Sequence, residues 1–122
     1  MEYKALNFDE KFGMLKEQWS PRVIAEMNDY QFKVVKITGD FIWHSHKDTD
    51  ETFIVLDGEL RIDLRDGFVY LKNGEMFVVP KMVEHKPYAE KEVKTLLIEP
   101  RGVLNTGDGE TSDLTAENDI WI

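Results

Sequence analysis

Apolar and polar residues alternate with a period of two along much of this chain. Residues 34–38 follow this rule, and residues 60–65 repeat it with Leu60, Ile62 and Leu64 on one face and charged side chains on the other. Successive side chains of a strand project to opposite faces, so the pattern predicts strands with one core face and one solvated or intersubunit face. Residues 52–56 are apolar or β-branched throughout, which predicts a strand buried on both faces.

Turn signals divide the predicted strands into short segments. Glycine follows or precedes a small polar residue in each of them: Gly39-Asp40, Asp57-Gly58, Asp66-Gly67 and Asn73-Gly74. The last three are typical of tight hairpins, and they delimit further strands at residues 68–71 and 76–79, with a last strand at 94–99. Short strands at regular spacing predict a sandwich or a barrel, so the expected fold class is all-β.

One short helix is expected near the start of the chain. Asn7 and Glu10 have the spacing of a capping box, and Phe8, Phe12 and Leu15 recur at helical intervals. The residue before a proline disfavours the helical conformation, so Ser20-Pro21 is expected to stop the helix.

The length allows one hydrophobic core. With 122 residues and 42% hydrophobic content, we expect a single domain over residues 1–122, with a barrel core at about 22–100. Residues 101–122 form a C-terminal extension with two interpretations. It is either a frayed acidic tail, or its apolar residues Ile120, Trp121 and Ile122 pack on the barrel or on a second subunit.

Composition limits the classes of binding partner and the cellular compartment that we expect. The absence of cysteine excludes disulfides and thiolate ligands and fits a reducing compartment. A net charge of −9 repels phosphate backbones and anionic lipids, so neither nucleic acid nor membrane is an expected partner. The first residues lack the layout of a signal peptide and no apolar run is long enough to span a bilayer, so we expect a cytoplasmic protein.

The three histidines of the chain fall in one spaced pattern with a glutamate. His44 and His46 would project to the same face of a strand, so their two imidazoles converge. Glu51 and His85 could complete a shell of three imidazoles and one carboxylate for one divalent transition metal per chain. Fe, Mn, Ni and Zn all accept such ligands, so the sequence does not select the metal.

The full pattern is Gly39-x4-His44-x-His46-x4-Glu51-x6-Gly58, followed by Gly74-x5-Pro80-x4-His85. It resembles the two motifs of the cupin superfamily, of which the first supplies two histidines and a glutamate and the second one histidine. The resemblance implies a single-domain cupin, a jelly-roll β-barrel, with His44, His46, Glu51 and His85 as metal ligands. Met82 and Ala89 depart from it, since the family often has glycine and asparagine at these positions.

Asp48 and Asp50 are alternative carboxylates near Glu51. If the strand has begun by Asp50, that side chain faces away from Glu51, and the family pattern selects Glu51. Phe53 and Val55 share the parity of Glu51, so they either line a pocket beside the metal or simply belong to the core.

Function follows less directly, because one fold hosts many activities. Four protein ligands leave two positions open on an octahedral metal, so we expect a metal-dependent enzyme acting on a small polar metabolite, by oxygenase-type or Lewis-acid chemistry. A non-catalytic binding or sensing module is the alternative. A sugar-phosphate isomerase is a third, but it needs inward cations, and Arg61, Arg65 and Arg101 are not clearly inward.

No catalytic residue besides the ligands stands out in the sequence. Tyr30 and Tyr88 are candidates for a proton or hydrogen-bond role only because a phenol can fill one. Strands with apolar residues on both faces leave an apolar outer surface, so we expect a homodimer.

Overall fold

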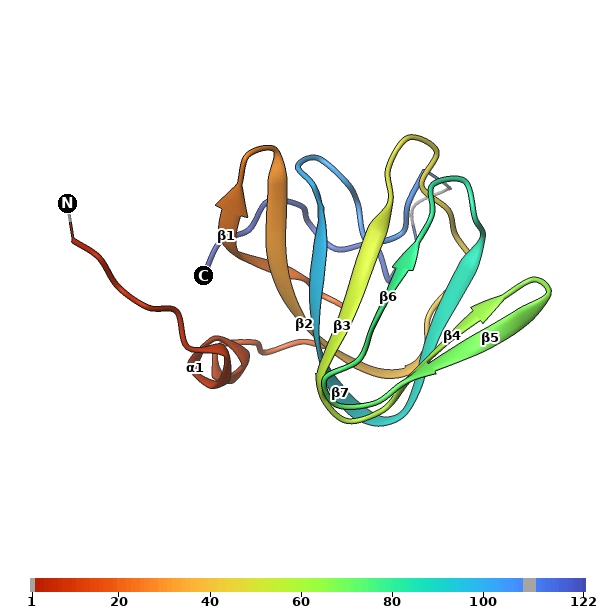
Figure 1. Ribbon diagram of the computed structural model, residues 1–122, viewed down its shortest axis with the longest axis horizontal. Helices are drawn as coiled ribbons and strands as arrows, with labels where there is room; N and C mark the ends of the chain where they lie inside the picture. Colours follow the sequence, from red (N-terminus) through yellow and green to blue (C-terminus); the bar gives the residue numbers. More distant parts are fainter. Residues whose placement is uncertain (1, 109–111) are drawn as a thin grey trace.

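The computed structural model describes residues 2–108 and 112–122 (Figure 1). One short helix precedes seven strands: α1 (Phe8–Gly13), β1 (Arg22–Met27), β2 (Tyr30–Asp40), β3 (Glu51–Asp57), β4 (Leu60–Leu64), β5 (Gly67–Leu71), β6 (Met76–Val79) and β7 (His85–Pro100). The expected all-β fold class with a short N-terminal helix is confirmed. In the part of the chain that the structure describes, no helix is long and apolar enough to cross a bilayer.

Two long strands, β2 and β7, organise the antiparallel sheet. They pair from Tyr30 opposite Pro100 to Asp40 opposite Tyr88. The other edge of β7 changes partner along its length, because its first residues pair with β4 and its later residues pair with β3. The sheet therefore runs β1-β2-β7-β3-β6 at one end and carries the β4–β5 hairpin at the other, and it curls around an interior (Figure 1).

Strand alternation places one set of apolar side chains inside this curl. The main core lies there, and its buried residues are Val35, Ile37, Phe53, Val55, Leu60, Ile62, Leu71, Val79, Ala89, Val93 and Leu97. A second cluster lies outside the sheet, where Phe12 of α1 and Leu15, which follows the helix, cover Val34 and Leu96. In β3 only the inner face is fully buried, because the outer residues Ile54 and Leu56 lie at the edge of that second cluster.

Three of the four turn signals are borne out as turns, but only one of these three closes a hairpin. Asp66-Gly67 does so, with Leu64 opposite Gly67 in the β4–β5 pair. Asp57-Gly58 and Asn73-Gly74 instead lead the chain to strands that do not pair with the preceding one, since β3 pairs with β6 and β7. Gly39 is not a turn residue but belongs to β2, at a bulge where its φ is +82°.

The predicted helix cap is present, whereas the helix is shorter than expected. The Glu10 amide donates to Asn7 Oδ1 at 2.9 Å. The helix ends at Gly13 rather than near Ser20, and Leu15 is buried although it lies beyond the helix. Glycine has a low helix propensity, because fixing its backbone costs more conformational entropy than for other residues. This favours the end of the helix at Gly13.

The described part of the C-terminal segment packs on the barrel. The Val23 amide donates to Ile120 O at 2.8 Å, and the Ile122 amide donates to Val23 O at 3.1 Å. Ile122 packs against the cluster around α1, while the Trp121 side chain stays half exposed. Of the two interpretations of this segment, the structure supports packing on the barrel.

Candidate metal centre

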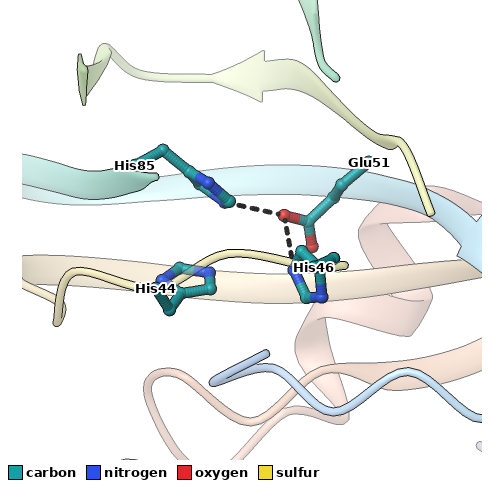
Figure 2. A group of neighbouring side chains, drawn as sticks. All are labelled: His44, His46, Glu51 and His85. Carbon is teal, nitrogen blue, oxygen red and sulfur yellow. Dashed lines mark hydrogen bonds and ion pairs between the residues drawn. The ribbon is translucent and has the colours of Figure 1, made fainter. Parts of the chain in front are cut away.

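Four side chains, His44, His46, Glu51 and His85, converge inside one end of the barrel (Figure 2). One ligand atom of each lies within 4.8 Å of those of the others, and all four residues are buried. These are the four residues that the sequence pattern predicted to come together. No other group of this kind is found among residues 2–108 and 112–122.

The first two histidines were expected on a strand, and the structure differs on this point. His44 and His46 lie in the segment between β2 and β3 and not on a regular strand. His44 makes an isolated bridge with His85, and the Met82 amide donates to His46 O at 2.7 Å. Alternation of the two side chains survives, because the bridge holds this segment extended beside the start of β7.

Two of the imidazoles are oriented by backbone carbonyls. His44 Nδ1 lies 2.9 Å from Ile42 O, and His85 Nδ1 lies 2.9 Å from Val83 O. A carbonyl oxygen only accepts, so each Nδ1 donates and each Nε2 is left to face the centre. Such a contact behind the ring is the usual support of a metal-ligating histidine.

His46 is the ring without such support. Both of its nitrogens are buried, and neither has a hydrogen-bond partner in the protein. Its Nε2 lies 3.4 Å from Glu51 Oε1, and the same oxygen lies 3.2 Å from His85 Nε2. A buried polar atom without a partner is costly, and a cation bound between these atoms would remove that cost.

Burial sets the charges of the site. Loss of solvent, followed by the proximity of His85, lowers the pKa of His44 to about 4, so its imidazole is neutral near pH 7. Burial alone would raise the pKa of Glu51, but the imidazoles of His46 and His85 outweigh it and hold that pKa well below its usual range. A neutral imidazole and an ionised carboxylate are the forms that bind metal.

A small cavity of about 30 Å³ opens beside His44 and Glu51. Its walls are mostly apolar, and they comprise Trp19, Pro21, Val35, Ile37, Phe41, Phe53, Pro87, Leu97 and Asn105. Phe53 also sets its ring edge-on to His85, so it lines the pocket as well as the core, whereas Val55 belongs to the core alone. Trp19 and Asn105 were not predicted to lie at the site, because both are outside the two motifs.

The remaining candidates lie away from the centre. Tyr30 is exposed, and Tyr88 stacks under Arg61, whose guanidinium carbon is 4.4 Å from the ring centroid. The three arginines pair with surface acids, Arg61 with Asp63, Arg65 with Glu84 and Arg101 with Glu26. Asp48 and Asp50 are exposed, and Asp50 Oδ1 accepts the Lys81 amide.

Met82 and Ala89 are accommodated despite their departure from the motif. Met82 adopts a φ of +71°, a conformation that favours glycine. Ala89 is buried and pairs with Gly39 across the β2–β7 ladder. Met82 therefore forms the turn before His85 in place of a glycine, while Ala89 lies within β7.

Two buried charged residues near the centre were not predicted. Lys33 and Glu99 form an ion pair of 2.8 Å inside the barrel. Burial and the charge of Glu51 raise the pKa of Glu99 well above its usual range, although Lys33 opposes this. Neither residue lies within the two motifs, and charged side chains on strands are usually solvated.

The sequence and the fold of this chain are similar to those of known proteins. A protein of Bacillus subtilis, the uncharacterized protein YdbB, is 36% identical over 86 residues, which are 70% of this chain and 76% of that protein. A cupin-2 domain containing protein from Shewanella frigidimarina, of known crystal structure, is 59% identical with a TM-score of 0.77, over 79% of this chain and 94% of its own.

The crystal structure of protein NMB1881 from Neisseria meningitidis is 35% identical with a TM-score of 0.72, over 80% of this chain and 99% of its own. The family model of the cupin domain matches residues 32–99, which include all four converging side chains and the strands that carry the core. The chain therefore belongs to the cupin domain family.

Proposed function

We propose that His44, His46, Glu51 and His85 bind one divalent transition metal, Fe, Mn, Ni or Zn, and that the chain is a metal-dependent enzyme acting on a small molecule. The observation that carries the proposal is the convergence of four buried donors, including a histidine whose nitrogens have no hydrogen-bond partner in the protein. When bound, such a metal supplies Lewis-acid polarisation of a chelated oxygen or activation of dioxygen.

The residues of the chain supply orientation and exclusion of water. Ile42 O and Val83 O fix two rings with Nε2 toward the centre. Most residues that line the cavity are apolar. Among the lining residues, only His44, Glu51 and Asn105 offer polar side chains that a ligand could contact. This favours a substrate whose polar atoms are concentrated at the end that reaches the metal and whose remainder is apolar.

A non-catalytic metal or ligand-binding module is the second candidate. It is favoured by the small size of the cavity. It is also favoured by the lining, because its titratable residues, His44 and Glu51, are both candidate metal ligands and no separate acid or base is among the lining residues that the structure describes. A sugar-phosphate isomerase is disfavoured, because no arginine or lysine is among the described residues that line the cavity.

Metal analysis of untagged protein, prepared without chelators, tests the proposal. We expect about one metal per chain in the wild type and none in His44→Ala/His46→Ala, whereas Asp48→Ala, an exposed carboxylate of the same segment, should keep the metal. Absence of metal in the wild type, even after adding Fe, Mn, Ni and Zn in turn, would remove the metal proposal.

Activity then separates the two candidates. Oxygen consumption with chelating substrates supports an oxygenase, and oxygen-independent turnover supports a Lewis-acid enzyme. Metal-dependent thermal stabilisation without turnover of any tested substrate supports the binding module.

We also propose a homodimer. Its support is the exposure of large apolar side chains on β5, Phe68 and Tyr70, and on β6, Met76 and Val78. Light scattering coupled to size-exclusion chromatography measures the mass, and a mass near 14.3 kDa would contradict the dimer.

A further inference from the structure

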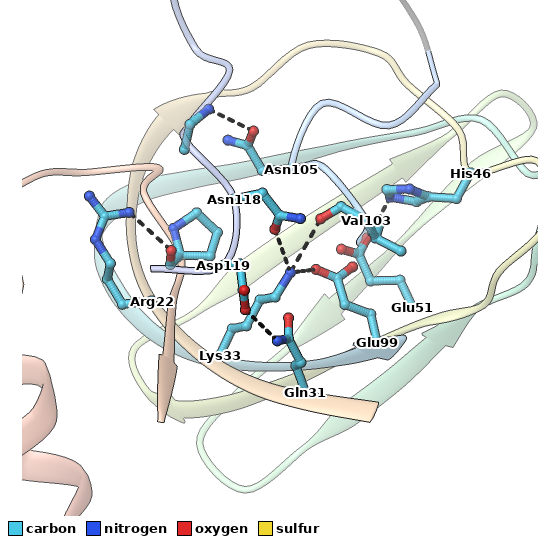
Figure 3. A network of polar contacts seen from close by, with 12 residues as sticks. Arg22, Gln31, Lys33, His46, Glu51, Glu99, Val103, Asn105, Asn118 and Asp119 are labelled. Atoms are coloured by element: carbon cyan, nitrogen blue, oxygen red, sulfur yellow. Dashed lines mark hydrogen bonds and ion pairs between the residues drawn. The ribbon is translucent and has the colours of Figure 1, made fainter. Parts of the chain in front are cut away.

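A buried ion pair lies directly beside the candidate ligand Glu51 (Figure 3). Lys33 Nζ contacts Glu99 Oε1 at 2.8 Å, and the two side chains are 4% and 1% exposed. Charged side chains are rarely buried this fully, because each one loses its hydration. Neither residue belongs to the group of candidate metal ligands, so the pair needs an explanation of its own.

The strand register explains why Glu99 meets Glu51. Thr52 pairs with Ile98 across β3 and β7, so the residues one step further along, Glu51 and Glu99, are cross-strand neighbours that point into the barrel. Two carboxylates in such positions repel each other. On the other side of β7, Gln31 pairs with Glu99, which places Lys33 diagonally across from it.

The C-terminal segment completes the surroundings of Lys33. Val103 O lies 3.2 Å and Asn118 Oδ1 lies 3.4 Å from Lys33 Nζ, in addition to Glu99 Oε1. An ammonium has three donors, so these three acceptors satisfy it. Lys33 is thereby fixed on the Glu99 side of the two carboxylates, as Figure 3 shows.

The contacts of Glu51 with the imidazoles lie on the side away from Glu99. One of its oxygens, Oε1, approaches both His46 Nε2 and His85 Nε2. Glu99 lies between the Glu51 carboxylate and Lys33. The second oxygen of Glu99, Oε2, has no hydrogen-bond partner in the protein. Without Glu99, the nearest cation for Glu51 inside the barrel would be Lys33.

We propose that Glu99, held by Lys33 and the C-terminal segment, is a positioning residue that keeps Glu51 directed at His46 and His85. Removal of the Glu99 carboxylate lets Glu51 turn toward Lys33 and form the ion pair in its place. The metal-binding consequence rests on the proposed function, whereas the orientation of Glu51 in the metal-free protein does not.

Cobalt binding tests the consequence. Co²⁺ is titrated into the wild type, Glu99→Ala, Glu99→Gln and Lys36→Met, with visible absorption to report the ligand geometry and competition with a chelator to give Kd. Lys36 lies on the opposite face of β2, where it donates to Leu15 O, so Lys36→Met is the matched control.

For Glu99→Ala we expect a changed Co²⁺ spectrum and affinity weaker by roughly 10- to 100-fold, the usual effect of losing a group that supports a ligand. Glu99→Gln fills the same space and still accepts from Lys33, so it should restore the wild-type spectrum and most of the affinity. Wild-type spectrum and affinity in a folded Glu99→Ala protein would overturn the proposal.

The ¹⁵N resonances of His46 and His85 in the metal-free protein provide an independent readout. These resonances should move in Glu99→Ala and stay in place in Lys36→Met, since only the former redirects Glu51. Resonances that do not move overturn the positioning role whether or not the protein binds metal. A wild type that binds neither Co²⁺ nor Fe, Mn, Ni or Zn overturns the proposed function instead.

If Glu99→Ala does not fold, Asn118→Ala replaces it. This variant removes one outer acceptor of Lys33 and leaves both carboxylates in place. A smaller shift of the same His46 and His85 resonances supports the proposal, and unchanged resonances overturn it.

Discussion

The backbones of His44 and His85 hydrogen-bond each other in both directions. His44 N lies 3.0 Å from His85 O, and His85 N lies 2.9 Å from His44 O. The centroids of the two imidazoles are 4.2 Å apart. This bridge joins the segment between β2 and β3 to the first residue of β7, so the protein fold itself brings together the two motifs that carry the candidate ligands.

Zn²⁺ binding should depend on the Glu51 carboxylate, because its Oε1 lies 3.4 Å from His46 Nε2 and 3.2 Å from His85 Nε2. Glu51→Gln keeps the shape of this side chain but replaces an ionised ligand with a neutral amide. Calorimetric titration with Zn²⁺ near pH 7 should therefore show binding at least tenfold weaker in Glu51→Gln than in the wild type. Equal affinities in the two proteins would mean that the Glu51 carboxylate is not a ligand.

The metal-free protein should lose stability as the pH falls below 6.5. The pKa of His44 is about 4 in the folded chain, below its value of 6.5 in the unfolded chain. Between these values the unfolded chain binds a proton that the folded chain does not, so the free energy of unfolding decreases with falling pH. At 1.36 kcal/mol for each pKa unit, the His44 contribution is about 3 kcal/mol, fully present above pH 6.5 and lost by pH 4.

The variant His44→Asn isolates this contribution, since its amide can still donate to Ile42 O but does not titrate. Urea unfolding between pH 4 and pH 7 should show a shallower dependence in the variant than in the wild type. Equal slopes in the two proteins would mean that His44 is not held neutral by burial.

The strands and the helix cap could be predicted because each depends on local pattern, and the four converging side chains could be predicted from their spacing and its resemblance to the cupin motifs. Period-two alternation identified the inner faces of β2 and β4, and the Asn7 cap follows from side-chain chemistry three residues away. The spacing of His44 and His46 correctly predicted that their side chains point the same way, although neither residue is on a regular strand. The backbone bridge between His44 and His85 keeps this segment extended.

Features that depend on distant partners could not be predicted in this way. Asp57-Gly58 has the composition of a hairpin, but the partner of β3 is decided by the whole sheet. Lys33 and Glu99 are far apart in the chain and meet only through the register of β2 and β7. Lysine and glutamate are rarely buried, but here each provides the counter-charge that allows the other to be buried.

Gly107 should be needed for the position of the first two histidines. Its φ is +72°, and a Cβ at this site would overlap Ser45 O and lie 3.3 Å from His44 Cδ2. The next residue fixes the same segment, because the Asp108 amide donates to Ser45 O and its carboxylate accepts the Lys47 amide. Gly107→Ala should therefore displace the His44–His46 segment and weaken Zn²⁺ binding by at least tenfold.

Gly102→Ala is the matched control for this substitution. Gly102 has a comparable φ of +91°, but no atom lies within 4 Å of a Cβ placed there. Both variants should lose roughly 1 kcal/mol of stability from backbone strain, whereas only Gly107→Ala should lose Zn²⁺ affinity. Equal affinities in the two variants would show that Ser45 and His44 tolerate the added methyl group.

Ile122 should contribute more to stability than its larger neighbour Trp121. The Ile122 side chain packs against the cluster around Phe12, while the Trp121 ring is half exposed and its Nε1 only reaches Asp119 Oδ1. Ile122→Ala removes part of a packed side chain and should cost roughly 1–2 kcal/mol, below the range for fully buried sites. Trp121→Ala should stay within about 0.5 kcal/mol, as for most exposed positions. Urea denaturation of the two variants measures both values, and a larger loss for Trp121→Ala would mean that its ring is covered in solution, as by a second subunit.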